Sequence, residues 1–292
     1  MQKEFSVLGA GYKAFCALQS LADRGLKPKR VCTYSVDGEA LDVDFAFQKL
    51  CFELEIEVLD QAVAGEIIAS NEIVFSIGWQ FMLTGNLSNF VVLHDSLLPR
   101  YRGFAPSVAA LINGETVHGV TALRAVSEVD SGPVASQVKL KLEYPLKIAD
   151  LFRKLGPLYA ECIAEVIALP SDLFNSLPAQ NENEASYSIW RDKDDFRVNW
   201  TRDAKYIERF INALGYPYTG ATTLLNDLPV SIHHCSVIPD VKFEERHPGK
   251  VWQLHADGSI DVVCGSGMIR VSDLRNSHGQ SVAPQRLRSR LN

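Results

Sequence analysis

The sequence predicts an α/β fold in which a parallel sheet with helices is followed by a smaller domain rich in β-strands. Two observations carry this prediction. In the first half, short apolar runs alternate with longer segments of helical periodicity, and the last part holds several short strand-like runs separated by turns. Strands that alternate with helices form parallel sheets through right-handed crossovers, whereas closely spaced short strands indicate a β-rich domain.

The first predicted strand covers residues 5–8 and ends in the turn Gly9-Ala10-Gly11. After this turn, Phe15, Leu18 and Leu21 recur at the spacing of a helix. Further strands are predicted from the apolar runs at 31–34, 55–59, 73–76 and 90–93. Helices are predicted over 41–54, 104–112 and, as the end of the first domain, 145–167.

The composition changes after this last helix. The segment 171–186 is rich in Asn, Ser, Pro and Glu and lacks a periodic apolar pattern, which is typical of a linker. We therefore expect a first domain over 1–170, a linker and connecting segment over 171–200, and a small β-rich domain over 201–292. In that last domain an apolar stripe from Ile207 to Leu214 predicts a helix. Its strands are predicted at 229–232, 249–252, 259–263 and 268–271.

Charge and hydropathy limit the partners of the chain. Its 292 residues are 47% hydrophobic, which is enough for a large domain and a smaller one. The formal net charge of −6 argues against a nucleic-acid partner, because phosphates are neutralised by clustered Lys and Arg. No signal peptide is visible and no apolar run reaches the length of a membrane span. A cytoplasmic protein without membrane contact is therefore expected.

The cysteines give no sign of a disulfide framework or a metal site. They lie scattered at positions 16, 32, 51, 162, 235 and 264, without a Cys-x-x-Cys pair. Such cysteines are typical of small buried hydrophobic residues in a reducing compartment. The cluster His233-His234-Cys235 contains zinc-binding side chains, but a second ligand pair at suitable spacing is missing. We therefore expect no metal.

A histidine and an aspartate lie at the ends of two apolar segments of the predicted sheet. His94 ends the apolar run 90–93, and Asp130 lies at the foot of a second apolar segment. Two strand ends of one parallel sheet can bring such side chains together. An aspartate beside an imidazole fixes its tautomer and makes it more basic, so the pair can move a proton near neutral pH. We expect a catalytic pair; the alternative is a buried histidine whose hydrogen bonds are satisfied within the core.

His94 and Asp130 belong to a set of three short motifs. Residues 94–103 read His-Asp-Ser-Leu-Leu-Pro-Arg-Tyr-Arg-Gly, residues 119–121 read Gly-Val-Thr, and residues 130–132 read Asp-Ser-Gly. In this order and spacing they resemble the hallmark of the formyltransferase family that uses formyl-tetrahydrofolate. The resemblance covers most of the chain. It continues through 186–191, 197–200 and 215–221.

This resemblance implies a Rossmann-like formyltransferase domain followed by a small β-rich domain, with His94 and Asp130 as the catalytic residues. It implies formyl-tetrahydrofolate as the formyl donor. Residues 9–14 and 186–191 are most similar to the branch that formylates amino sugars attached to nucleotides. The expected function is transfer of a formyl group to the primary amine of an amino-sugar nucleotide, and a homodimer is expected.

The resemblance also implies which residues hold the two substrates. The candidates for the pterin pocket of the folate are Gln80, Phe81, Met82, Leu83 and Val129. The candidates for the sugar nucleotide are Gly9, Gly11, Lys13, Ser96, Arg100, Tyr101 and Arg102. Each set has a plainer alternative. The apolar loop residues could be ordinary core, and the Arg side chains could hold their own loop by pairing with Asp or Glu.

One departure from the family hallmark leaves the function open. Val92 stands two residues before His94, where the hallmark has an Asn whose amide is expected to donate a hydrogen bond to the formyl oxygen. Losing one such donor typically costs about 2.7–4 kcal/mol of transition-state stabilisation. Ser96, Gln80 or a backbone N–H could replace it, and Asp95 in place of the usual proline indicates local remodelling. Val92 is the main argument for one alternative, a non-catalytic folate or nucleotide-sugar binding protein. A formyl-tetrahydrofolate hydrolase and a methionyl-tRNA formyltransferase of the same fold are further alternatives, and the acidic net charge disfavours the second of these.

Overall fold

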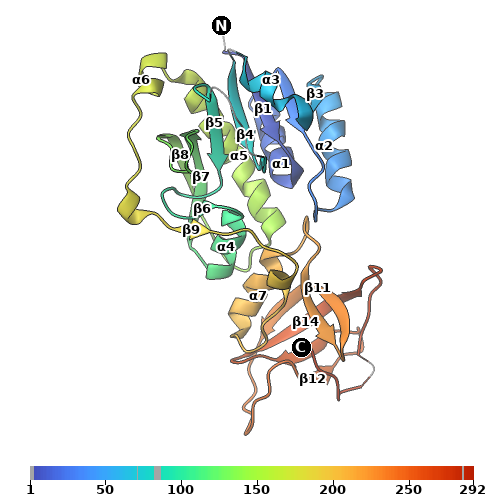
Figure 1. Cartoon of the computed structure of the whole chain (residues 1–292). Helices are drawn as coiled ribbons and strands as arrows, with labels where there is room; N and C mark the ends of the chain where they lie inside the picture. Colours follow the sequence, from blue (N-terminus) through green and yellow to red (C-terminus); the bar gives the residue numbers. More distant parts are fainter. Residues whose placement is uncertain (1–2, 71, 82–86, 285) are drawn as a thin grey trace. The chain divides into compact units, whose positions relative to one another are not determined.

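The structure is a computed structural model that describes residues 3–70, 72–81, 87–284 and 286–292. The chain divides into two compact units (Figure 1). Unit 1 consists of Met1–Ser107, Thr116–Leu142 and Ala149–Trp190, and unit 2 of Val108–Glu115, Glu143–Ile148 and Arg191–Asn292. The division differs from the expected linker over 171–200, because residues up to Trp190 belong to unit 1.

Unit 1 contains a seven-stranded sheet with the order β3-β2-β1-β4-β5-β7-β8, which runs from right to left in Figure 1. Its strands are β1 (Phe5–Gly9), β2 (Arg30–Thr33), β3 (Glu57–Asp60), β4 (Ile73–Ile77), β5 (Phe90–His94), β7 (Val117–Arg124) and β8 (Val134–Lys141). The five strands from β3 to β5 pair in parallel, which confirms the predicted α/β fold. The strands β7 and β8 pair antiparallel, so the sheet is mixed rather than wholly parallel.

Four helices of unit 1 occur where the apolar periodicity predicted them: α1 (Gly11–Asp23), α2 (Leu41–Glu53), α4 (Pro106–Asn113) and α5 (Ile148–Ala168). Two short helices were not predicted, α3 (Ala64–Ile68) and α6 (Ser171–Asn175), and α6 begins the segment that was interpreted as a linker. Short 3-10 turns occupy Gln61–Val63, Glu182–Glu184 and Asp194–Phe196. Pro106 opens α4, where its missing N–H removes no intrahelical hydrogen bond.

The middle of the sheet is buried and mostly apolar, as in parallel sheets whose two faces are both covered. Every residue of β1 is buried, and so are all but one of the residues of β4 and of β5. The strand β5 therefore carries His94 on a rigid, buried element and delivers it at the carboxyl end of the parallel part of the sheet.

The motif Gly-Val-Thr lies on β7, directly beside the end of β5. His94 pairs with Thr121 across these two strands. A Cβ at Gly119 would lie 2.2 Å from the carbonyl oxygen of Val138 and 2.6 Å from a methyl group of Leu97. Glycine is therefore required here, because β8 and the loop after His94 both approach the backbone of β7 too closely for a side chain.

Unit 2 contains a five-stranded antiparallel sheet with the order β10-β11-β14-β13-β12. Its strands are β10 (Ala221–Leu225), β11 (Leu228–Ile238), β12 (Val251–Leu254), β13 (Ile260–Val263) and β14 (Met268–Asn276). The helix α7 (Ala204–Ala213) packs against β11 and β14, and Asp203 caps it by accepting from the N–H of Tyr206 at 2.9 Å. The β-rich second domain is confirmed, with β10 as a strand that the sequence pattern did not reveal.

In the described part of the chain, no helix combines the length and the apolar character needed to span a membrane.

The close contact at Gly119 predicts a large cost for the smallest side chain. We expect Gly119→Ala to lower the free energy of unfolding by about 1–3 kcal/mol, because the methyl group forces strands or the loop apart. Unfolding in urea measures this loss. Gly65→Ala is the matched control: a Cβ there meets nothing within 4 Å, so it should raise stability by about 0.4–1 kcal/mol. Equal effects of the two substitutions would contradict the packing argument.

Candidate active site

His94 and Asp130 meet in unit 1. The Nδ1 atom of His94 lies 3.4 Å from a carboxylate oxygen of Asp130, and both side chains are largely buried. On the other side of the ring, Nε2 lies 2.7 Å from the backbone carbonyl of Tyr101. Both neighbours of the imidazole accept hydrogen bonds, so the ring satisfies both at once only when each nitrogen carries a proton. A neutral His94 can donate to only one of these two acceptors.

Asp130 comes from a loop, not from the strand end that the sequence led us to expect. It lies between β7 and β8 and has a φ of 50°, in the left-handed region that L-residues seldom adopt. The same carboxylate oxygen that faces His94 accepts a hydrogen bond from the N–H of Gly103 at 2.8 Å. The backbone around it is also held, because the amide of Gln180 donates to the carbonyls of Asp130 at 2.8 Å and Gly132 at 2.7 Å.

Arg102, expected at the mouth of the site, is 1% exposed. Its guanidinium donates to both carboxylate oxygens of Glu182, at 2.7 and 2.8 Å, and to the side-chain oxygen of Gln180 at 2.9 Å. Hydrogen bonding to Glu182 raises the pKa of Arg102 and lowers that of Glu182. The geometry therefore matches the alternative role for this arginine, which is to hold its own loop.

Asp95, the residue that follows His94, anchors a buried polar chain. One carboxylate oxygen pairs with the ammonium of Lys13 at 3.1 Å, and the other accepts from the hydroxyl of Ser107 at 2.5 Å. The hydroxyl oxygen of Ser107 lies 3.0 Å from Nε2 of His118. Burial alone would raise the pKa of Asp95, but Lys13, His94 and the Ser107 hydroxyl together lower it well below its usual range. The carboxylate is thus a fixed negative charge next to the candidate catalytic histidine.

Val92 stands at the position of the hallmark Asn, and Ser96 is one of the residues that could replace its amide as a donor. Ser96 is fully buried, and its hydroxyl donates to the carbonyl of Arg100 at 2.7 Å, so that hydrogen is committed within the loop. Val92 is half-buried and packs, together with Trp79, against an apolar cluster that includes Leu8. Because side chains alternate along a strand, Val92 points to the same face of β5 as His94. This face is lined with an apolar side chain where the family hallmark has an amide.

The Gly9-Ala10-Gly11 turn is occupied by a carboxylate of the chain itself. Glu39 accepts a hydrogen bond from the N–H of Tyr12, in the first turn of α1, at 2.9 Å. A Cβ at Gly11 would lie 2.6 Å from the same carboxylate. Burial raises the pKa of Glu39. An anion already sits where this helix N-terminus would attract a phosphate, which argues against a dinucleotide here. Lys13, expected to bind a diphosphate, is paired with Asp95.

Three aromatic rings gather at the loop after β4. Tyr34 packs edge-on against Trp79 and Phe81 at centroid distances of 5.3 and 4.8 Å, and its hydroxyl donates to the carbonyl of Gly78 at 3.2 Å. Burial raises the pKa of Tyr34 to about 12. Gln80 is exposed, and Phe81 and Val129 are 47% and 55% exposed. The other two folate candidates, Met82 and Leu83, lie outside the described residues.

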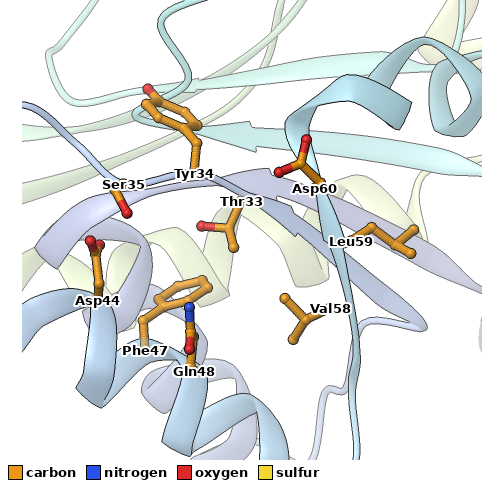
Figure 2. Close-up of a pocket in the computed structure, with 9 residues that line it drawn as sticks. All are labelled: Thr33, Tyr34, Ser35, Asp44, Phe47, Gln48, Val58, Leu59 and Asp60. Carbon is orange, nitrogen blue, oxygen red and sulfur yellow. The ribbon is translucent and has the colours of Figure 1, made fainter.

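A pocket of about 270 Å³ lies at the carboxyl ends of β2 and β3 (Figure 2). It is lined by Thr33, Tyr34, Ser35, Asp44, Phe47, Gln48, Val58, Leu59 and Asp60. Figure 2 shows side chains of α2 and of the two strands around this space. Of the aromatic group, only Tyr34 reaches it, and neither His94 nor Asp130 lines it. The pocket is therefore separate from the candidate catalytic pair.

Among the residues that the structure describes, no group of three or more His, Cys, Asp or Glu side chains is arranged to hold a metal ion. In the cluster at 233–235, Nε2 of His233 lies 2.8 Å from the hydroxyl of Ser231. Cys235 is buried, and this burial raises the pKa of its thiol.

Comparison with known proteins identifies the family. The family model "formyl transferase" matches residues 65–167, and the model "formyl transferase, C-terminal domain" matches residues 191–290. The chain belongs to the formyltransferase family. The second match begins at the residue where the main segment of unit 2 begins.

Several curated relatives are methionyl-tRNA formyltransferases. The one from Nitrosomonas europaea is 31% identical over 191 residues, which are 65% of this chain and 58% of that protein. The one from Marinobacter nauticus is 32% identical over 198 residues, 65% of this chain and 60% of that protein. These matches thus span less than two thirds of each relative. A third, from Nitrosospira multiformis, is 26% identical over 285 residues and covers 92% of this chain and 90% of that protein.

Solved structures share the fold. The N-formyltransferase from Helicobacter canadensis in complex with folinic acid and dTDP-3-aminofucose has a TM-score of 0.60 at 17% identity and covers 93% of this chain and 99% of its own. HypX from Aquifex aeolicus in complex with tetrahydrofolic acid has a TM-score of 0.66 at 16% identity and covers 97% of this chain and 46% of its own.

Several residues near the site were not found from the sequence. Gln180 and Glu182 lie in the polar segment that was interpreted as a linker, and Glu39 lies between predicted elements. Their composition is that of ordinary surface loops, so no local pattern marks them. Among these residues, only Asp95 could be noticed from the sequence, because a charged residue stands there in place of the proline of the hallmark.

Removing the cation from the Lys13–Asp95 pair should destabilise the protein. Lys13→Met leaves a buried carboxylate without its counter-ion, and such changes cost about 3–5 kcal/mol. Urea unfolding at pH 7 should show this loss. Lys49→Met is the control, because Lys49 pairs with Glu53 at 3.8 Å on the exposed surface and should contribute less than about 1 kcal/mol. A small loss for Lys13→Met would show that the pair contributes little.

The same pair should make stability sensitive to acid. The pKa of Asp95 is lowered in the folded protein, so the unfolded chain takes up the proton first, at its usual pKa of about 3.9. The wild-type protein should therefore lose this part of its stability as the pH falls below about 4. In Lys13→Met the ammonium no longer lowers the pKa of Asp95, so this variant should lose less stability than the wild type as the pH falls. Urea unfolding at pH 7 and pH 3.5 measures both; parallel losses would contradict the assignment.

Proposed function

We propose that this protein transfers a formyl group from formyl-tetrahydrofolate to the primary amine of an amino-sugar nucleotide. The observation that supports this most is the buried pair of His94 and Asp130, 3.4 Å apart, within the motifs of the formyltransferase family. An imidazole oriented by a carboxylate is suited to take up the proton that an amine loses on acylation. Positioned bases of this kind contribute about 10²–10⁴-fold to a rate.

The residues present fit a reduced folate. Formyl-tetrahydrofolate, when bound, supplies the one-carbon group. Tyr34, Trp79 and Phe81 would form the apolar wall for its pterin ring, and Nε1 of Trp79 is buried without an acceptor among the described residues. A flat ring with acceptors on its edge suits such a wall. The proposed contacts remain Gln80, Phe81, Met82, Leu83 and Val129.

Within the proposed reaction, His94 changes one hydrogen-bond partner. Asp130 holds the Nδ1–H of the ring, and the carbonyl of Tyr101 occupies the Nε2 side in the structure. The substrate amine takes the place of this carbonyl and forms a bond to the formyl carbon, and Nε2 accepts the proton that the amine loses. The bond between the formyl carbon and the tetrahydrofolate nitrogen then breaks, and the proton held on Nε2 passes to that departing nitrogen, which leaves the ring neutral again. The donor that replaces the hallmark Asn is then Gln80 or a backbone N–H, because the hydroxyl of Ser96 is committed.

The nucleotide part of the substrate is assigned to the loop after His94. Arg100 is exposed and lies over the ring of Tyr101, with 5.3 Å from its guanidinium carbon to the ring centroid. An arginine of this kind recognises phosphate through paired hydrogen bonds. Gly9, Gly11 and Lys13 are weaker candidates, because Glu39 and Asp95 place negative charge around them.

Methionyl-tRNA formylation is the second candidate, favoured by the curated relatives. The net charge of −6 speaks against it, since a tRNA partner calls for a basic surface.

The experiment that separates these functions uses the purified protein with formyl-tetrahydrofolate and three acceptors: amino-sugar nucleotides, methionyl-tRNA and none. Mass spectrometry of the products is the readout. A formylated sugar nucleotide supports the proposal. Formylated methionyl-tRNA assigns the second candidate, formate without any acceptor assigns a hydrolase, and folate binding without a product assigns a binding protein.

His94→Gln should lower kcat by at least about 10²-fold, because a side chain of similar reach cannot accept the proton. The far-UV circular dichroism spectrum should stay unchanged. His278→Gln is the control at an exposed histidine in unit 2, and it should keep full activity. Retained turnover in His94→Gln would remove this residue from the mechanism.

A further inference from the structure

The segment between α6 and the end of unit 1, residues 176–190, forms an extended strap. Of its residues, only 186–190 belong to a motif that resembles the formyltransferase family. Figure 1 shows it in yellow, running from α6 along the side of unit 1 where β7 and β8 lie, as far as β9 (Tyr187–Ser188). We propose that this strap positions the catalytic pair, and that Gln180 is the residue through which it fixes Asp130. The inference deepens the proposed function and rests on it.

The strap fixes the loop that carries Asp130. Gln180 donates both of its amide hydrogens to this loop, to the carbonyls of Asp130 and Gly132. Its side-chain oxygen accepts from the guanidinium of Arg102. One amide side chain thus joins the loop of Asp130 to the loop that follows His94. All of its hydrogen-bonding groups are used, so its orientation is fixed as well.

The strap also fixes the loop that faces the other side of His94. The N–H of Arg102 donates to the carbonyl of Ser186 at 2.8 Å, and the hydroxyl of Ser186 accepts from the N–H of Tyr101 at 3.0 Å. The strands β6 (Arg102–Gly103) and β9 pair in parallel. A Cβ at Gly103 would lie 2.4 Å from the carbonyl oxygen of Ser188, so the two backbones are in direct contact.

Both partners of the His94 ring are therefore held by the same strap. Asp130 faces Nδ1 and is tied down by Gln180, and the Tyr101 carbonyl faces Nε2 and is tied down by Ser186. Asp130 and Tyr101 have φ values of 50° and 60°, which L-residues adopt only when surrounding contacts impose them. Without the strap, these two loops would relax toward ordinary backbone conformations and leave the ring.

Replacing the amide by a carboxylate tests this role. Gln180→Glu keeps an oxygen for Arg102 but has no hydrogens for the two carbonyls and brings a negative charge toward them. The control is Asn183→Asp, the same change of amide to carboxylate at an exposed position of the strap. Gln180→Ala is the second variant if the first does not fold, as judged by circular dichroism.

The first readout needs no turnover. In nuclear magnetic resonance spectra of the ligand-free protein, Gln180→Glu should shift the ring signals of His94, whereas Asn183→Asp should leave them unchanged. Unchanged His94 signals in Gln180→Glu would overturn the proposal whatever reaction the protein catalyses. If the His94 signals shift but the protein has no formyltransferase activity, the positioning role of the strap stands and only the proposed function is rejected.

The second readout separates positioning from a merely structural role. In a formyl-transfer assay, Gln180→Glu and Gln180→Ala should lower kcat by about 10- to 100-fold, the scale of a misplacement of about 1 Å, with little change in KM for the folate. In an Asp130→Asn background, Gln180→Ala should have little further effect on kcat, because both changes remove the same arrangement. Additive losses of kcat in this double-mutant cycle would overturn the role assigned to Gln180. So would a change in KM as large as the change in kcat.

Discussion

The candidate catalytic pair depends on one constraint, which is that a strand residue and a loop residue must stay close to one another. His94 ends a buried strand and has little freedom to move. Asp130 has no regular element to hold it, and its backbone adopts a conformation that is unfavourable for an L-residue. The pair therefore exists only because other segments impose it. In this protein those segments come from far along the sequence.

The charges around the site are mostly neutralised by the chain itself. Asp95 is paired with Lys13, Glu39 accepts from the N-terminus of α1, and Arg102 is paired with Glu182. Buried charges persist only when they are paired and hydrogen-bonded. The same pairing takes several positively charged or hydrogen-donating groups away from any phosphate. Arg100, in the same loop as Arg102, is exposed.

The strand end that carries His94 differs from the family hallmark at two positions. Val92 replaces a polar residue and joins the apolar cluster that also supports Trp79. One step along the chain from His94, Asp95 brings a fixed negative charge that the hallmark lacks. The two changes exchange a neutral donor on one side of the histidine for an ionised acceptor on the other. Local electrostatics in this member of the family thus rest on a different set of side chains.

The sequence by itself determined the α/β class, the approximate bounds of most helices, the position of His94 at a strand end and the identity of its partner Asp130. It could do so because apolar periodicity is a local property and the motifs keep a fixed order. Only the tertiary structure decided that β7 and β8 run antiparallel, that Arg102 turns inward, and that residues 176–190 belong to unit 1. These outcomes depend on contacts such as Gln180 with Asp130, between residues distant in sequence, and no local pattern of residues encodes such contacts.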